Sequence, residues 1–185
     1  MATHSKKPKR VFKGKIFDVY QWKQKMFDGT SKIFEYVKRK DAVVIIPSQK
    51  NKIIALKQKQ PHTGWFYCTP SGRMDIKGEK PLECAKRELM EETGMVSEHW
   101  KLWKKIKHRG KVKNTIYIYI AQNCEKIAQQ RLDGGEKIQI KPLTFEQFLN
   151  LSKKPSHHIA ETVVDMLMAR LSPKFNKKYK KALFG

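Results

Sequence analysis

Residues 87–95 read Arg87-Glu88-Leu89-Met90-Glu91-Glu92-Thr93-Gly94-Met95, and Glu79 lies eight positions before Arg87. The carboxylates of Glu88, Glu91 and Glu92 fall at i, i+3 and i+4, which share one face of a helix. Three like charges so close repel one another, and a divalent cation removes the repulsion because hard oxygen ligands suit Mg²⁺ or Mn²⁺. The alternative is a solvated acidic face, since glutamate is a good helix former.

The residues around these carboxylates predict a helix that packs on a sheet. Pro81 suits the first turn, where its missing N–H does no harm. Leu82, Ala85 and Leu89 form an apolar stripe at helical spacing. Gly94 is a suitable left-handed stop just after the last turn.

A turn that exposes its backbone precedes this helix. The strand-like residues 65–69 lead into Pro70-Ser71-Gly72-Arg73, and a loop connects this turn to the helix. Strand, glycine turn and acidic helix together predict a site at which a backbone carbonyl and several carboxylates converge.

This segment resembles the signature of the Nudix hydrolases, Gly-x5-Glu-x7-Arg-Glu-U-x-Glu-Glu-x-Gly-U, in which U is aliphatic. Glu79 to Met95 match its second part in full. One departure is that six residues, rather than five, separate Gly72 from Glu79. The extra residue lies in the loop before the helix, so the helical carboxylates keep their register. The position of the Ser71 or Gly72 carbonyl is left open.

The resemblance implies roles for the residues of the signature. Glu88 and Glu92 are the expected principal ligands of Mg²⁺ or Mn²⁺, assisted by Glu91 and Glu79, and the Ser71 carbonyl is a further candidate ligand. Bound divalent ions can activate water and neutralise charge on a phosphoryl oxygen. Arg87 is expected to hold the carboxylates by ion pairing rather than to touch substrate.

Other segments resemble the ADP-ribose and nucleoside-diphosphate-sugar pyrophosphatase branch of this family. Residues 34–37, followed by Arg39, resemble its Glu-x-Val near the end of two N-terminal strands, and residues 56–58 resemble its Leu-x-x-Gln segment. The alternative for these positions is a strand end that faces water. The resulting candidate substrate contacts are Glu35, Arg39, Gln58 and Arg73.

A late acidic loop, residues 132–136, resembles the one from which this branch takes a catalytic base. Only Asp133 and Glu136 are acidic there. We assign the base to Glu136, and the alternative is a simple turn residue. The implied function is metal-dependent hydrolysis of the diphosphate linkage in ADP-ribose or a nucleotide sugar.

The length of 185 residues predicts one domain, 14–171, between basic tails at 1–13 and 172–185. The order of elements predicts an α+β fold with a mixed sheet flanked by helices. The resemblance implies an α/β/α sandwich, the Nudix fold, with extra N-terminal antiparallel strands that pair two subunits into a homodimer. Outside the acidic helix, the expected strands are 15–25, 31–39, 41–47, 52–60, 65–69, 100–107, 115–122 and 137–141, and the expected helices are 144–151 and 157–171.

Cysteine usage and hydropathy favour a cytoplasmic protein with no membrane partner. Cys68, Cys84 and Cys124 are odd in number and widely spaced, so reduced thiols are expected. The longest apolar runs, 42–46 and 116–121, are far too short to cross a bilayer as helices.

The formal net charge is +23, and three stretches hold 18 of the 40 lysines and arginines. These stretches are residues 6–15, 101–113 and 174–181. Such a field attracts polyanions, so RNA is a candidate partner. The alternative is charge that merely keeps the protein soluble. Two further functions therefore stay open: an RNA 5′-pyrophosphohydrolase, and a non-catalytic Nudix-fold protein that binds RNA or the ribosome.

Overall fold

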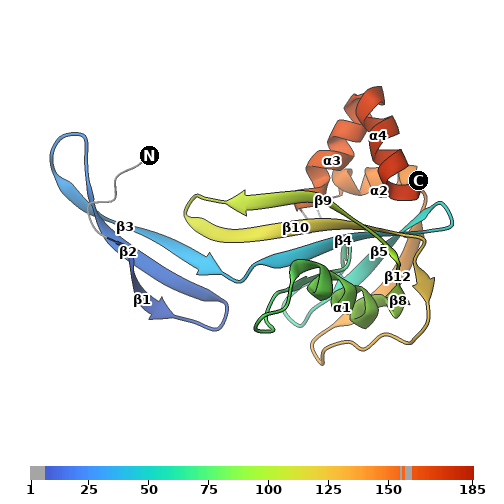
Figure 1. Ribbon diagram of the computed structural model, residues 1–185, viewed down its shortest axis with the longest axis horizontal. Helices are drawn as coiled ribbons and strands as arrows, with labels where there is room; N and C mark the ends of the chain where they lie inside the picture. The colour runs from blue at the N-terminus through green and yellow to red at the C-terminus, as the bar shows by residue number, and fades with distance from the viewer. Residues whose placement is uncertain (1–6, 155, 157–159) are drawn as a thin grey trace.

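A mixed sheet with helices on both faces forms the body of the protein (Figure 1). The computed structural model describes residues 7–154, 156 and 160–185. Its strands are β1 (Lys9–Lys13), β2 (Phe17–Lys25), β3 (Ser31–Arg39), β4 (Ala42–Gln49), β5 (Lys52–Lys59), β6 (Phe66–Cys68), β7 (Ser71–Arg73), β8 (Met95–Val96), β9 (His99–His108), β10 (Val112–Gln122), β11 (Glu125–Lys126) and β12 (Lys137–Leu143). Its helices are α1 (Pro81–Thr93), α2 (Phe145–Asn150), the short 3-10 helix η1 (Leu151–Lys153), α3 (Ala160–Leu171) and α4 (Pro173–Phe184).

The main path of the sheet runs β1-β2-β3-β10-β4-β5-β12, and β9, β7 and β6 pair with β10, β4 and β5. Strand β10 lies parallel to β4 and, over a short stretch, to β3. The other pairs are antiparallel. A two-residue turn with positive φ at Lys50 and Asn51 joins β4 to β5, as the right-handed twist of a hairpin favours.

The central strands are buried on both faces, so successive side chains enter two different cores. Val43 and Ile45 pack with Leu89 of α1 on one face. Val44 and Ile46 belong to the core that contains side chains of α2, α3 and α4 on the other face. The predicted fold class, an α+β sandwich of helix, mixed sheet and helix, is confirmed.

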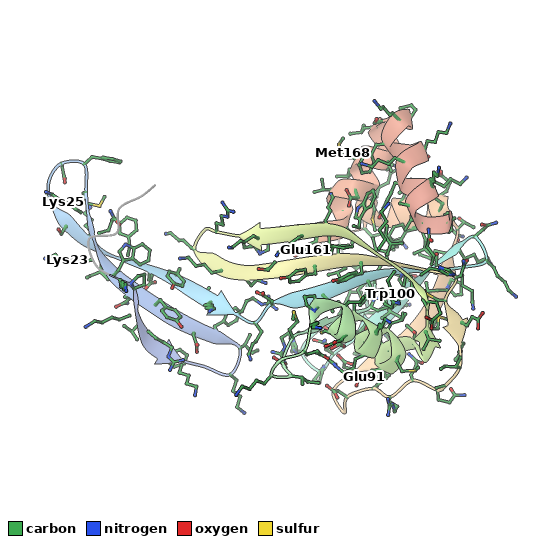
Figure 2. All side chains as sticks on the ribbon, viewed as in Figure 1. Lys23, Lys25, Glu91, Trp100, Glu161 and Met168 are labelled. Atoms are coloured by element: carbon green, nitrogen blue, oxygen red, sulfur yellow. The ribbon has the colours of Figure 1, made fainter. Side chains whose placement is uncertain are left out.

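Strands β1, β2 and β3 form an arm that extends from the body (Figure 1). Lys23 and Lys25 lie toward the far part of this arm (Figure 2). The β2–β3 turn has Gly29 at φ 83°, and the Asp28 carboxylate accepts hydrogen bonds from the Thr30 backbone N–H and hydroxyl. The expected N-terminal antiparallel strands are therefore present.

Both basic ends of the chain carry secondary structure within the described residues. Residues 9–13 form β1, whose side chains are all exposed. Residues 173–184 form α4, in which Tyr179, Ala182 and Leu183 are buried. The expected helix at 157–171 begins at Ala160 as described, and its first three expected positions lie outside the described residues.

None of the helices in the described part of the chain is long and apolar enough to cross a membrane. Cys68, Cys84 and Cys124 are buried and form no disulfides.

Replacing Leu183 by alanine should lower the free energy of unfolding by about 2–5 kcal/mol, because a fully buried side chain leaves a cavity under α4. Urea unfolding monitored by circular dichroism measures this loss. The matched control is Lys180→Ala on the exposed face of the same helix, which should stay within about 0.5 kcal/mol of the parent. Equal stability of all three proteins would show that α4 does not contribute to the core.

Candidate functional site

One cavity, of about 760 Å³, brings most of the predicted site residues together. Its walls come from β3, β4, β7, α1, β10, α3 and the loop before β12. Figure 2 shows Glu91 on the helix that supplies the acidic wall, α1. The predicted residues that line the cavity are Arg39, Ser71, Arg73, Arg87, Glu88, Glu91, Glu92 and Glu136.

Arg87 connects the carboxylates of α1 to the residue that precedes the helix. Its guanidinium donates to both carboxylate oxygens of Glu79, through Nε at 2.8 Å and Nη2 at 3.2 Å. Its Nη1 donates to Glu88 Oε1 at 2.7 Å and to Glu91 Oε2 at 2.9 Å. The predicted ion pairs of Arg87 are thus present, and they hold carboxylates that would otherwise repel one another.

The β7 backbone lies directly against two of these carboxylates. The Ser71 backbone N–H donates to Glu92 Oε2 at 3.0 Å. A Cβ atom at Gly72 would lie 1.9 Å from Glu88 Cδ, closer than any side chain could be placed. Only glycine at position 72 therefore leaves room for the Glu88 carboxylate in this arrangement.

The extra residue of the loop between Gly72 and Glu79 is accommodated away from the carboxylates. The Met74 backbone N–H donates to the Asp41 carbonyl, so the chain stays beside the sheet at the start of the loop. Gly78 then adopts a φ of 86°, a left-handed conformation that glycine accommodates without strain. The register of α1 is unaffected, and the Gly72 backbone still contacts Glu88.

The loop after β11 binds the end of α1. The Ile127 and Ala128 N–H groups donate to the Gly94 carbonyl, and the Arg131 N–H donates to the Glu91 carbonyl. Gly94 has a φ of 69°, and a Cβ there would lie 2.0 Å from the Ala128 carbonyl oxygen. The last carbonyls of the helix therefore have partners, and the loop is fixed against α1.

Burial governs the charge of the carboxylates. It raises the pKa of Glu88 to about 7, although the neighbouring Arg87 pulls it down. Burial also raises the pKa of Glu92 well above its usual value, although the hydrogen bond that Glu92 accepts from the Ser71 N–H lowers this pKa. The Glu79 pKa is instead lowered by its bonds to Arg87. Two acids of the site thus hold their protons more tightly than exposed glutamates do.

The donor set fits a hard divalent cation, because carboxylate oxygens are the ligands that Mg²⁺ and Mn²⁺ prefer. In the described part of the chain, no three acidic, histidine or cysteine side chains are already grouped closely enough to hold a metal. Arg87 bonds one oxygen each of Glu88 and Glu91. Burial raises the pKa values of Glu88 and Glu92, and the positive charge of a bound cation would favour their ionised forms. The chemistry of these donors therefore fits the ion.

Glu136 is far from α1 in the sequence, but it lines the same cavity as the carboxylates of that helix. Gln58 Nε2 donates to Glu136 Oε1 at 3.3 Å, and the Cys68 thiol lies 3.2 Å from Gln58 Oε1. Burial, reinforced by the nearby Asp133 carboxylate, raises the pKa of Glu136, while the bond from Gln58 lowers it. This carboxyl therefore holds its proton more tightly than an exposed glutamate does.

Three predicted site residues do not line this cavity. Gln58 is buried behind Glu136, which it contacts. Glu79 lies under Arg87. Glu35 is on the arm, where its carboxylate accepts a hydrogen bond from Gln21.

Several lining residues were not predicted because they come from distant segments without a signature of their own. No spacing in the sequence links them to the acidic helix, and only the sheet topology brings them there. They include Gln60, Asn114, Arg131 and Glu161.

The chain matches one family model and is similar to several known proteins. The sequence model of the NUDIX domain family matches residues 38–164. An ADP-ribose pyrophosphatase of Bacillus subtilis (strain 168) is 28% identical over 157 residues, which are 83% of this chain and 84% of that protein. A methanol dehydrogenase activator of Bacillus methanolicus is 26% identical over 176 residues, 93% of this chain and 95% of that protein. The crystal structure of an ADP compounds hydrolase superposes with a TM-score of 0.75 at 19% identity, covering 94% and 95% of the two chains.

In the metal-free protein, the Glu88 carboxyl should titrate with a pKa near 7 instead of 4.5. Because the folded pKa exceeds the unfolded one, this group disfavours the folded state increasingly as pH rises from 4.5 through 7. Arg87→Gln should raise the Glu88 pKa further, since the guanidinium stabilises the ionised form. Side-chain carboxyl carbon-13 NMR measures both midpoints.

The matched control for this titration is Lys86→Gln, which removes a neighbouring positive charge from the exposed side of α1. It should leave the Glu88 midpoint nearly unchanged. A Glu88 midpoint near 4.5 in the parent protein would contradict the burial that the structure gives this carboxyl.

Proposed function

Since the chain belongs to the Nudix family, we propose that it hydrolyses the diphosphate linkage of a nucleoside diphosphate derivative, with ADP-ribose or a nucleotide sugar as substrate. The observation that carries this proposal is the carboxylate array of α1, joined by Arg87 and facing the cavity. The names of the Bacillus subtilis relative and of the ADP compounds hydrolase support the substrate class.

We assign the metal site to Glu88 and Glu92, with Glu91 and the β7 backbone at Ser71 beside it. A bound Mg²⁺ or Mn²⁺ would activate a water molecule and neutralise charge on the diphosphate. Arg87 keeps the carboxylates in one array, and Glu79 holds the guanidinium. Because these carboxyls bind protons tightly, cation affinity should fall as pH drops below about 7.

Glu136 is our candidate for the general base. Its carboxyl lines the same cavity as Glu88, and the Gln58 amide donates to it. A carboxyl whose pKa is raised by burial can take a proton from a nucleophilic water at neutral pH. Gln58 is then a positioning residue, which orients Glu136 through this hydrogen bond.

Arg39 and Arg73 line the cavity and are our candidates for binding the diphosphate oxygens. Arginine suits this role because its planar guanidinium offers several donors to phosphate oxygens. A protein that only bound RNA would have no use for buried carboxylates that repel one another, so the intact array favours catalysis over the non-catalytic alternative.

The arm favours association of two copies. Its apolar side chains have no helix over them: Ile33 is 65% exposed and Phe12 is 59% exposed. Such a surface on an extended pair of strands suits burial against a second copy of this chain. We propose a homodimer that pairs through β1, β2 and β3. The three unpaired thiols are in keeping with a cytoplasmic location, which we retain as a proposal.

Glu92→Gln should reduce Mg²⁺-dependent hydrolysis of ADP-ribose by about 10²–10³-fold, because the neutral amide removes a cation ligand. The fold should survive, since glutamine can accept the Ser71 N–H bond and avoids burying a charge. Release of AMP and ribose 5-phosphate, measured with Mg²⁺ and after chelation with EDTA, tests the proposal.

Glu83→Gln is the matched control on the same helix. Glu83 is exposed in the first turn, where its side chain accepts from the Lys80 N–H, and glutamine preserves that cap. It should retain the parent turnover. If Glu92→Gln hydrolysed ADP-ribose as fast as Glu83→Gln, the assigned metal site would be wrong.

Ile33→Lys should convert a dimer into a monomer, because a charge placed in an apolar interface must be desolvated. Size-exclusion chromatography with light scattering measures the mass. Ile127→Lys is the matched control, since Ile127 is 63% exposed but lies on the body of the protein. A parent protein of monomer mass, or equal masses for both variants, would refute this mode of pairing.

A further inference from the structure

A second cavity, of about 560 Å³, adjoins the candidate catalytic cavity. The two share four lining residues, Arg39, Asn114, Ile116 and Glu161, and are therefore adjacent. The second cavity continues to the tip of the β9–β10 hairpin, which supplies Lys107, His108, Arg109, Gly110 and Val112.

The two cavities differ in charge. Carboxylates of α1 line the first, whereas Arg39, Lys107 and Arg109 place three positive charges on the walls of the second. Glu161, which lies on α3 beside the hairpin, is the acidic residue among the described residues that line the second cavity (Figure 2). The balance there favours an anion.

Arg39 stands at the boundary between the cavities with donor capacity to spare. Its Nε is buried and has no hydrogen-bond partner among the described residues, and its guanidinium carbon lies 5.9 Å from the centre of the Phe17 ring. A buried, unpaired donor is costly unless a ligand or water satisfies it. Because Arg39 lines both cavities, its guanidinium can contact a ligand that crosses from one cavity to the other.

The hairpin that carries the other two cations is anchored close to its tip. His108 pairs with Asn114 across β9 and β10, and the His108 ring contacts Asn114 Oδ1 at 2.9 Å. The Val37 N–H donates to the Lys111 carbonyl, which ties the tip to β3. Lys107 and Arg109 therefore start from a backbone that is fixed relative to Arg39.

We propose that the second cavity binds a phosphate group on the ribose of the nucleotide whose diphosphate lies in the first. This inference rests on the proposed function and narrows its substrate class to nucleoside diphosphate derivatives with an additional ribose phosphate. A cavity of this size holds a phosphorylated sugar, and the shared wall at Arg39 makes this cavity a neighbour of the one assigned to the diphosphate. The phosphate can be a terminal monoester or the first phosphodiester of an oligonucleotide.

Binding of product-like ligands tests this without turnover. The probes are AMP, adenosine 3′,5′-bisphosphate and the dinucleotide pApA, titrated into the full-length protein by calorimetry with Mg²⁺ present. Adenosine 3′,5′-bisphosphate and pApA each carry one ribose phosphate more than AMP. We expect at least one of these two probes to bind about tenfold more tightly than AMP, since hydrogen bonds to charged groups are strong. Preference for the bisphosphate identifies a monoester site, and preference for pApA identifies an oligonucleotide site.

The variant is Lys107→Gln combined with Arg109→Gln, which should abolish the tenfold preference and leave AMP affinity unchanged. Lys101→Gln combined with Lys105→Gln removes the same charge from the exposed positions of β9 outside the cavity and should keep the preference. Glu161→Gln should increase the preference, because it removes the opposing charge from the same wall.

Equal affinities for all three probes, or an equal loss of preference in both double variants, would overturn the inference. Absence of binding by every probe would overturn it as well. These outcomes are distinct from failure of the proposed function, which would appear as no Mg²⁺-dependent hydrolysis of any nucleoside diphosphate derivative even if the bisphosphate bound more tightly than AMP.

Discussion

The close approach of β7 to α1 is the constraint on which the site depends. The strand backbone touches the carboxylate of Glu88 at Gly72 and donates a hydrogen bond to Glu92 at Ser71. Both contacts require the sheet and the helix to be held at a fixed separation. The core between α1 and the sheet, with Leu89 fully buried, sets this separation. Packing on one side of the helix thereby determines the position of the charges on the other.

The close packing of β7 against α1 also lowers the stability of the folded protein. Burial of Glu88 and Glu92 raises their pKa values and disfavours their ionised forms. Arg87 offsets part of the cost for Glu88, and its own placement depends on Glu79. A protein without use for the cavity would gain stability by neutral substitutions here. The second core, between the sheet and α2, α3 and α4, provides stability that does not depend on these charges.

The sequence predicted those parts of the molecule whose residues are close together in the chain. Glu88, Glu91 and Glu92 lie within one helix, so spacing alone placed them on one face, and Gly94 marked the end of that helix. In contrast, Glu161 and Asn114 reach the cavity only because β10 lies parallel to β4 and α3 packs beside it. No local pattern contains this information.

Two of the elements that were not predicted, α4 and β1, were missed for different physical reasons. Helix α4 carries five lysines, and their charge obscured the apolar stripe of Phe175, Tyr179, Ala182 and Leu183 at helical spacing. Strand β1 has no buried side chain, so its sequence shows no alternation of apolar and polar residues that would indicate a strand. Glu35 and Gln58 were predicted to contact substrate from short resemblances, and this stays a prediction; within one chain they contact Gln21 and Glu136.

The bonds between the end of α1 and the loop after β11 have a mechanical consequence. Gly94, Glu91 and Glu92 accept from this loop, whose continuation leads to Glu136 and on to the ladder between β12 and β5. The acidic helix and the candidate base are thus parts of one stiff frame and cannot separate without breaking several bonds at once.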